Sequence, residues 1–155
     1  KAEPAAENAQ TLKKDTDAAN NAANNNENDN EMEDDLNIDA QDVELLARAV
    51  YSEARGEPMD GQIAVAAVIL NRVEDEEFPD SIPGVIFQPQ AFTAITDGQF
   101  WYEPDNQAYE AVEKALEGED PSNGALYYYN PEKSTSAWIY SRPVIKKIGS
   151  HLFAG

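Results

Sequence analysis

The stretch Asp42–Asn71, DVELLARAVYSEARGEPMDGQIAVAAVILN, has the pattern of two helices joined by a tight break. In its first half, apolar residues recur at the three- and four-residue intervals of one helix face; they are Val43, Leu46, Ala47 and Val50. Its second half contains the run Ile63–Leu70, which has no polar face. A helix that is apolar all round lies in the centre of a domain, so this stretch predicts the helical core of the fold.

The ends of both helices follow from residues that favour helix termini. Asp39 is a suitable N-cap for a helix over about residues 40–54. Gly56 can end that helix in a left-handed conformation. Asp60 is the expected N-cap of the second helix, over about residues 61–72.

Glu53 lies in the last turn of the first expected helix and points the same way as its apolar residues. A carboxylate at the inward end of an apolar face is costly unless it is paired, protonated or functional. One interpretation is a structural carboxylate paired with Arg48 or Arg55. The other is a general acid that apolar surroundings keep protonated, as cleavage of a glycosidic bond requires. The residues alone leave both interpretations open.

The remainder of the chain predicts one more long helix and a small sheet. An amphipathic pattern predicts a helix over Asp105–Leu116, and Ser81–Phe87 has the pattern of a helical turn. Short strands are expected over Ala125–Tyr129 and within Trp138–Phe153. Together these elements predict an α+β domain over residues 39–155, with a helical core and a short β-sheet.

Between these elements, Gln88–Glu103 is rich in aromatic residues and is expected to be irregular. Its aromatic rings could stack on the faces of sugars, or they could simply cover the core. The residues do not decide between these two roles.

Residues 1–38 differ in composition from the rest of the chain. They are rich in Ala, Asn, Glu and Asp and contain no aromatic residue. Such a segment cannot bury enough apolar surface to offset the entropy lost on ordering. We expect an acidic, disordered linker or tail; a helical extension is the alternative, because Ala and Glu favour helix whereas the Asn runs oppose it.

The charge and the residue types exclude several classes of function. The 155 residues include 30 acidic and 11 basic side chains, a net charge of −19. This charge disfavours nucleic acid and anionic membranes as partners, because both repel it. The chain has no cysteine and one histidine, so thiolate chemistry and multi-histidine metal sites are excluded. No nucleotide-binding motif is present and no apolar run is long enough to span a bilayer; we expect no cofactor, no metal and no membrane insertion by this segment.

Four segments in order resemble the catalytic domain of the spore cortex-lytic enzymes, the germination-specific cell-wall hydrolases of the SleB/CwlJ type. They are ARAVYSEARGEP (47–58), GQIAVAAVILNRV (61–73), GVIFQPQAFTAITDGQ (84–99) and YYYNPEKSTSAWIYSRPVIKKIGSHLF (127–153). The resemblance implies a small lysozyme-like domain, distantly similar to goose-type lysozyme and lytic transglycosylases. It implies cleavage of peptidoglycan between N-acetylmuramic acid and N-acetylglucosamine, with a 1,6-anhydromuramic product, in the spore cortex during germination.

The resemblance also assigns site residues. The family's catalytic glutamate corresponds to Glu53, whereas Glu57 is expected to be structural. If a second carboxylate takes part, Asp97 is the first candidate, and the product would then be a simple reducing end. Residues that match family motifs and are expected to bind the glycan are Phe92, Thr93, Tyr128, Trp138, Ser141, Arg142 and His151.

The resemblance implies an extracytoplasmic enzyme of a spore-forming bacterium that acts as a monomer on peptidoglycan glycan strands. Two departures from the family are visible. Gln90 stands where many relatives have glycine, and residues 42–155 carry a net charge of −11, from 19 acidic and 8 basic side chains. Because peptidoglycan is also anionic, this acidity leaves cortex specificity open. The alternatives are a muramidase-type hydrolase of the vegetative wall and a non-catalytic peptidoglycan-binding module.

Overall fold

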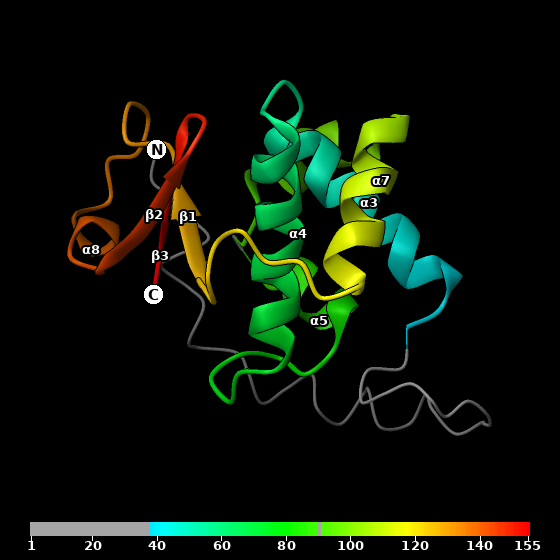
Figure 1. Cartoon of the computed structure of the whole chain (residues 1–155), viewed down its shortest axis with the longest axis horizontal. Helices are drawn as coiled ribbons and strands as arrows, with labels where there is room; N and C mark the ends of the chain where they lie inside the picture. The colour runs from blue at the N-terminus through cyan, green and yellow to red at the C-terminus, as the bar shows by residue number, and fades with distance from the viewer. Residues whose placement is uncertain (1–37, 90) are drawn as a thin grey trace.

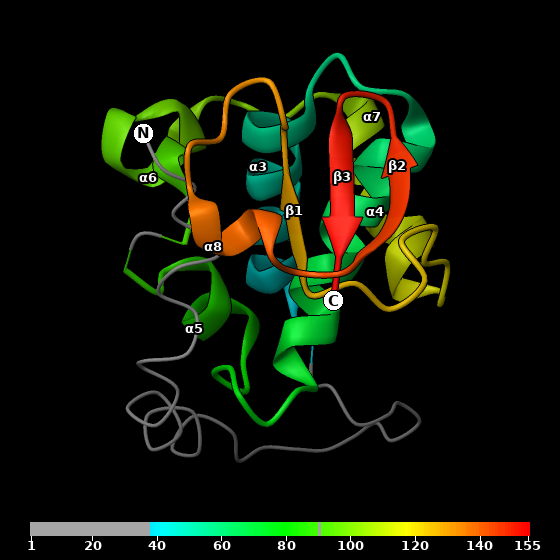
Figure 2. The same cartoon turned by 90° about the vertical axis from the view of Figure 1, so that its left-hand side faces the viewer.

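The computed structural model describes residues 38–89 and 91–155, which fold into a helical layer packed against a small sheet (Figure 1). Figure 2 looks onto the antiparallel sheet, with the long helices behind it. This arrangement confirms the expected α+β class. No helix in the described residues is long and apolar enough to cross a membrane. The expected linker lies outside the described residues, except for Ile38, which packs against the core.

The first long helix, α3, lies where the sequence predicts it. It spans Ala40–Ala54, and the side chain of its N-cap, Asp39, accepts a hydrogen bond from the backbone N–H of Asp42. Gly56 follows the end of the helix with a φ of +87°, a left-handed conformation that glycine adopts readily. Glu53 therefore lies in the last turn of α3, next to the chain reversal that leads into the second helix.

The second helix, α4, spans Met59–Val73 and begins earlier than predicted. The prediction of Asp60 as its N-cap is wrong, because Pro58 occupies that position. The carbonyl oxygen of Pro58 accepts hydrogen bonds from the backbone N–H groups of Gly61 and Gln62. Asp60 instead lies in the first turn, where a negative charge interacts favourably with the helix dipole. In the apolar run of α4, residues 63–69 are buried on all sides, as the sequence predicts, and Leu70 is partly buried.

The other expected helical segments are present, and two more occur. α7 spans Asn106–Leu116 and is N-capped by Asp105, and α5 spans Ile82–Ile86. The region expected to be irregular contains the short helix α6, Thr93–Asp97, and the 3₁₀ turn η1, Gln99–Trp101. The expectation is therefore wrong for these residues. Helices this short depend on tertiary contacts rather than on the periodic pattern that identifies long helices.

The sheet contains β1 (Tyr127–Tyr129), β2 (Val144–Ile148) and β3 (His151–Ala154). The strand order is β1-β3-β2, and both pairs are antiparallel. In this register Tyr128 lies opposite Phe153. β3 is central and mostly buried, whereas β2 forms an exposed edge.

One part of the predicted strand region is a helix. The segment Trp138–Tyr140 has the aromatic and β-branched residues typical of a strand, but it belongs to α8, Ala137–Tyr140. The Ser136 side chain accepts a hydrogen bond from the backbone N–H of Ile139 at 3.2 Å and so caps this helix. The local cap therefore outweighs strand propensity here.

A hydrogen-bonded loop fixes the entry into β1. Asn71, near the end of α4, donates from Nδ2 to Asp120 and to the carbonyl oxygen of Ala125, both at 3.0 Å. Asp120 also accepts hydrogen bonds from the backbone of Ser122 and Gly124. Burial alone would raise the pKa of Asp120, but these hydrogen bonds outweigh burial and lower it. The loop therefore anchors β1 against the end of α4.

Candidate functional site

Glu53 and Tyr128 form the centre of the candidate site, although they lie 75 residues apart in the sequence. The hydroxyl group of Tyr128 donates a hydrogen bond to Glu53 Oε1 at 2.8 Å. Glu53 comes from α3 and Tyr128 from the middle of β1, so this bond joins the helical layer to the sheet. Tyr128 is buried, whereas Glu53 is partly exposed. A carboxyl group that is both fixed and accessible can exchange a proton with a bound ligand.

A buried arginine, Arg72, lies close to this pair. It comes from the last turn of α4, is 0% exposed, and donates from Nε to the carbonyl oxygen of Leu126 at 2.8 Å. Its guanidinium lies 5.0 Å from the ring centroid of Phe78 and 5.5 Å from that of Tyr127. Burial lowers the pKa of Arg72, while the neighbouring tyrosines and then Glu53 favour its charged form. A buried positive charge therefore acts on the candidate site.

From the sequence, Arg72 is expected only to end the helix over about residues 61–72. The available signal is an arginine that directly follows a long apolar run, in a segment predicted to lie at the centre of the domain. A buried arginine is rare without a specific partner, so this position could have been marked as a candidate. Its partners come from distant segments, and no local pattern identifies them.

His151, the first residue of β3, packs edge-on against the ring of Tyr128, with the ring centroids 5.3 Å apart. It is 8% exposed, and within the described residues its Nδ1 atom has no hydrogen-bond partner. Burial lowers the pKa of His151; the charge of Glu57 opposes this shift, and that of Lys133 adds to it. The imidazole is therefore neutral at neutral pH. The predicted site residues Glu53, Tyr128 and His151 thus come together.

Glu57 connects the break between α3 and α4 to the turn between β2 and β3. Its carboxylate accepts a hydrogen bond from the backbone N–H of Ser150 at 3.0 Å and another from the Ser150 hydroxyl. A side chain at Gly149, where φ is +58°, would collide with this carboxylate. Burial would raise the pKa of Glu57, but the hydrogen bonds from Ser150, with smaller electrostatic contributions from His151 and Lys147, lower it overall. These contacts agree with the expected structural role.

Replacing Glu57 by Gln is expected to make stability less dependent on pH. The folded-state pKa of Glu57 lies below its usual value of 4.5. Its stabilising contribution is therefore present above that pH and is lost as the pH falls through the folded-state pKa. The variant should be less stable than the parent at neutral pH by about 1 kcal/mol. The difference should shrink at about pH 3. Urea unfolding at both pH values measures the difference in the free energy of unfolding between parent and variant. An equal difference at both pH values would contradict a stabilising contact of the charged Glu57 carboxylate.

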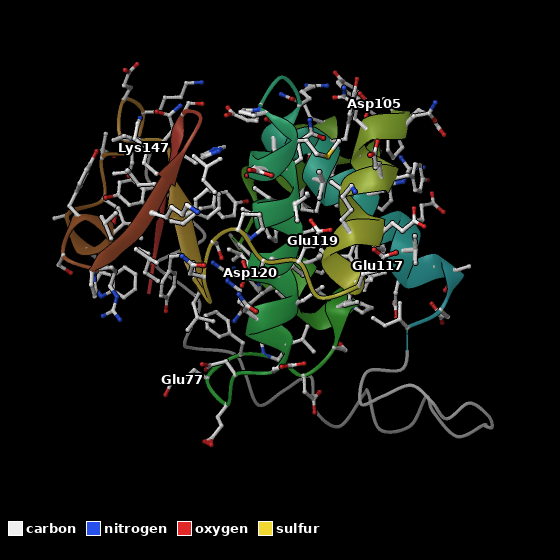
Figure 3. The ribbon with its side chains drawn as sticks, in the orientation of Figure 1. Glu77, Asp105, Glu117, Glu119, Asp120 and Lys147 are labelled. Atoms are coloured by element: carbon white, nitrogen blue, oxygen red, sulfur yellow. The ribbon has the colours of Figure 1, made fainter. Side chains whose placement is uncertain are left out.

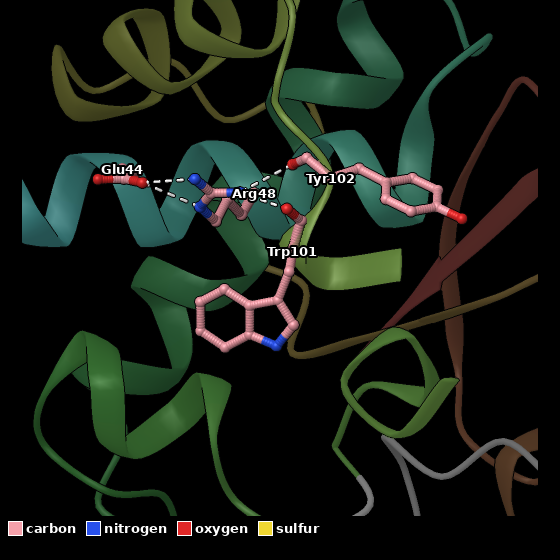
Figure 4. A network of polar contacts seen from close by, with 4 residues as sticks. All are labelled: Glu44, Arg48, Trp101 and Tyr102. Carbon is pink, nitrogen blue, oxygen red and sulfur yellow. Dashed lines mark hydrogen bonds and ion pairs between the residues drawn. The ribbon is translucent and has the colours of Figure 1, made fainter. Parts of the chain in front are cut away.

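Arg48, one proposed structural partner of Glu53, has a different acidic partner (Figure 4). Its Nη2 atom lies 2.7 Å from Glu44 Oε2. Its Nη1 atom donates to the carbonyl oxygens of Trp101 and Tyr102, both at 2.9 Å. Arg48 therefore ties the segment after α6 to α3.

Arg55, the other proposed partner, connects to Asp97 through Gln99. Arg55 Nη2 donates to the side-chain oxygen of Gln99 at 2.6 Å, and the backbone N–H of Gln99 donates to Asp97 Oδ1 at 3.1 Å. Asp97 is exposed at the end of α6. The candidate second carboxylate is thus linked to a residue two positions after Glu53.

Three further predicted site residues gather around α8. The guanidinium of Arg142 lies 5.2 Å from the ring centroid of Trp138 and 5.7 Å from that of Tyr127. Arg142 Nε also donates to the carbonyl oxygen of Gly155 at 3.0 Å. The Ser141 hydroxyl donates to the carbonyl oxygen of Trp138 at 2.6 Å. This second cluster adjoins the first through Tyr127, which also contacts the buried arginine.

The remaining predicted residues lie at the start of α6. The side chain of Phe92 is 3% exposed and belongs to the hydrophobic core. Thr93 is the first residue of α6, and only its backbone is described. Gln90 lies outside the described residues. Within the described part of the chain, no group of three His, Asp or Glu side chains is placed to hold a metal ion.

Comparisons with known proteins find close relatives over most of this fold. The chain is 61% identical over 112 residues to the spore cortex-lytic enzyme of Oceanobacillus iheyensis, a match that covers 72% of the chain and 41% of the relative. It is 31% identical over 118 residues to the cell wall hydrolase CwlJ of Bacillus subtilis, covering 72% of the chain and 83% of that relative. The chain thus spans less than half the length of the spore cortex-lytic enzymes it matches.

Two solved structures have the same fold. The catalytic domain of the Bacillus cereus SleB protein matches with a TM-score of 0.74 and 51% identity, over 81% of this chain and 98% of that one. The catalytic domain of the germination-specific lytic transglycosylase SleB from Bacillus anthracis matches with a TM-score of 0.73 and 53% identity, over 76% and 97%.

The family model described as Cell Wall Hydrolase matches residues 56–154. The match contains β1 with Tyr128, α4 with Arg72 and the whole sheet, and it begins three residues after Glu53. With relatives of 57–61% identity among spore cortex-lytic enzymes, this match establishes that the chain belongs to the cell wall hydrolase family of enzymes.

Proposed function

We propose that this chain is the catalytic part of a peptidoglycan lytic enzyme in which Glu53 is the general acid. The bond cleaved is the one between N-acetylmuramic acid and N-acetylglucosamine. The observation that carries the proposal is the hydrogen bond from Tyr128 to Glu53, which fixes a partly exposed carboxyl group where two layers of the fold meet. The relative whose name includes lytic transglycosylase supports this class of reaction.

In the proposed mechanism, Glu53 protonates the glycosidic oxygen as the bond between that oxygen and C1 of muramic acid breaks. The resulting carboxylate then accepts the proton of the C6 hydroxyl of the same muramic acid, whose oxygen attacks C1. The products are a free hydroxyl on the leaving sugar and a 1,6-anhydromuramic end. One carboxyl group serves both steps because the nucleophile belongs to the substrate, so no second carboxylate at a fixed separation is needed. Tethering of the hydroxyl gives it a high effective concentration.

In this mechanism Tyr128 positions the catalytic carboxyl group. Its hydroxyl contacts Glu53, and its ring is held against His151 and Phe153, with centroid distances of 5.3 and 5.9 Å. The buried charge of Arg72 interacts electrostatically with Glu53.

Replacing Tyr128 by Phe is expected to lower kcat about tenfold with little change in KM, because the carboxyl group loses its positioning hydrogen bond while the substrate keeps its contacts. The ring contacts remain, so the melting temperature should change little. Turnover of soluble glycan chains and thermal unfolding measure both effects. A large rise in KM with kcat unchanged would mean that Tyr128 binds substrate and does not position Glu53.

The glycan contacts proposed from the resemblance remain proposals. Trp138 is partly exposed and Ser141 is exposed, which suits contact with a sugar. Arg142 lies beside Trp138, and His151 packs against Tyr128. Phe92 and Thr93 would contribute from the start of α6. We further propose a distant likeness of this fold to goose-type lysozyme and action as a monomer outside the cytoplasm, on the spore cortex of a spore-forming bacterium.

A hydrolase that uses water is the second candidate function. It is supported by the chain of contacts from Asp97 through Gln99 to Arg55, a residue two positions after Glu53. Asp97 would then activate water, and the product would carry an ordinary reducing end. A non-catalytic binding module is the least supported alternative, because the candidate acid is present and held in place.

Mass spectrometry of the fragments released from purified cortex and from vegetative wall tests the function directly. We expect soluble muropeptides with 1,6-anhydromuramic ends, released faster from cortex. Fragments that end in N-acetylglucosamine would mean that another bond is cleaved. Equal release from both walls would remove the cortex preference from the proposal.

A further inference from the structure

The charges of the domain are segregated between its two layers. Residues 126–155, which form the sheet and α8, contain four basic side chains and one acidic side chain, a net charge of +3. Residues 38–125, which form the helical part, contain 19 acidic and 4 basic side chains, a net charge of −15. In Figure 3, Lys147 lies on the sheet, whereas the labelled acidic residues lie on the helical part and its loops. The overall acidity of the domain therefore conceals a basic surface.

The basic surface consists of Lys133, Arg142, Lys146 and Lys147. The three lysines are exposed. Lys146 and Lys147 are successive residues of the edge strand β2, so their side chains point to opposite faces of the sheet and the basic surface wraps around this edge. The neighbouring side chains of Val144 and Ile145 are also 50% and 40% exposed.

The four basic residues of the helical part are not grouped in this way. Arg72 is buried, Arg48 is paired with Glu44, and Lys114 is partly exposed. Arg55 is exposed and donates to the side chain of Gln99. Among the described residues, several exposed lysines thus occur together in the sheet layer and not in the helical part.

This surface adjoins the candidate catalytic site. Lys133 is close enough to influence the pKa of His151, and Lys147 that of Glu57. β2 is separated from β1, which carries Tyr128, by the single strand β3. At the usual spacing between strands, β2 lies roughly 10 Å from β1. A polymer whose scissile bond lies at Glu53 therefore has neighbouring groups within reach of the lysines.

We propose that this basic surface binds the carboxylates of the peptide stems on the glycan strand. The inference rests on the proposed function, since it takes peptidoglycan as the ligand. Peptidoglycan is anionic through these carboxylates, and a domain with a net charge of −11 over residues 42–155 would be repelled if its charge were evenly spread. With the charges segregated, the polymer at Glu53 meets the basic side chains of the sheet, whereas most of the acidic side chains belong to the helical part. The surface thus orients the enzyme on its substrate.

Binding to purified sacculi tests this inference in a background that carries Glu53→Gln, so that the polymer stays intact. Lys147→Glu and Lys114→Glu form a matched pair, because each changes the net charge by two units. Lys114 lies on α7 in the helical part. Lys146→Glu combined with Lys147→Glu extends the series. Charge reversal keeps the edge strand charged, which limits edge-to-edge association. Thermal unfolding and gel filtration verify that each variant is folded and monomeric.

We expect the affinity for sacculi to fall about threefold for Lys147→Glu and about tenfold for the double variant at low ionic strength. It should fall less than about twofold for Lys114→Glu, and all differences should shrink at about 0.5 M salt. When the peptide carboxylates of the sacculi have been converted to neutral amides, the parent chain should bind these sacculi no more tightly than the double variant does. Removal of teichoic acids should leave the differences unchanged.

Equal affinities of the Lys147→Glu and Lys114→Glu chains would overturn the inference. So would differences that vanish when teichoic acids are removed, because phosphate would then be the ligand. These outcomes are independent of the proposed reaction, since binding is measured without turnover. A chain that binds as expected but releases no fragments in its catalytic form would instead contradict the proposed function.

Discussion

Replacing Glu53 by Gln is expected to abolish wall lysis while leaving the fold intact. The amide keeps the shape of the carboxyl group, and its oxygen can still accept the hydrogen bond from Tyr128. It cannot donate a proton to the glycosidic oxygen with the acidity that the reaction needs. Loss of an essential general acid lowers the rate by on the order of 100-fold or more. The turbidity of a sacculus suspension measures the rate, and thermal unfolding measures the fold.

Glu57→Gln is the matched control for this experiment. It makes the same chemical change four residues away, at a carboxylate whose described hydrogen bonds are to Ser150. This control should keep most of the activity while losing some stability. If folded Glu53→Gln protein keeps more than about a tenth of the parent's rate, Glu53 is not the general acid.

Replacing Arg72 by Ala is expected to have the largest effect on stability. Arg72 is fully buried, donates to the carbonyl oxygen of Leu126, and lies against the rings of Phe78 and Tyr127. The substitution leaves a cavity, an unpaired carbonyl group, and Glu53 without the nearby positive charge. Loss of a buried charged group with such partners costs about 3–5 kcal/mol. Chemical denaturation of the parent and variant measures the difference.

Arg72→Lys separates the contribution of charge from that of shape. Lysine keeps the positive charge but lacks the planar guanidinium that packs against both rings. We expect Arg72→Lys to lose less stability than Arg72→Ala and to keep more activity than the alanine variant does. A loss below about 1 kcal/mol for Arg72→Ala would mean that the arginine is not a central element of the structure.

The long helices could be predicted from the sequence because each combines a periodic apolar face with residues that favour helix ends. α3 has both, and its limits, Ala40–Ala54, agree with the prediction. The start of α4 differs from the prediction because Pro58 caps this helix through its backbone carbonyl group, and such a cap has no side-chain signal in the sequence. The residues of α8 favour a strand, but the serine cap at Ser136 outweighs this propensity and they form a helix.

The residues of the candidate site can be predicted from the sequence better than their arrangement in space. Local pattern placed Glu53 at the end of a helix but left its role open, and the family resemblance added Tyr128 and His151. The contact between Glu53 and Tyr128 depends on how a sheet formed by the last 30 residues packs against two helices formed much earlier in the chain. No spacing rule encodes a contact over 75 residues. For the same reason, no local sequence pattern predicts the contact of the Glu57 carboxylate with Ser150.

The central claim is that Glu53 acts with a nucleophile supplied by the substrate, and digestion in water enriched in heavy oxygen tests it most directly. Purified cortex is digested to completion, and the muramic ends of the released fragments are weighed by mass spectrometry. The account predicts 1,6-anhydromuramic ends that carry no label, because the C6 hydroxyl attacks C1 and water takes no part. Incorporation of heavy oxygen at the new muramic end of most fragments would contradict it. Water would then be the nucleophile, and Asp97 would be the first candidate for its base.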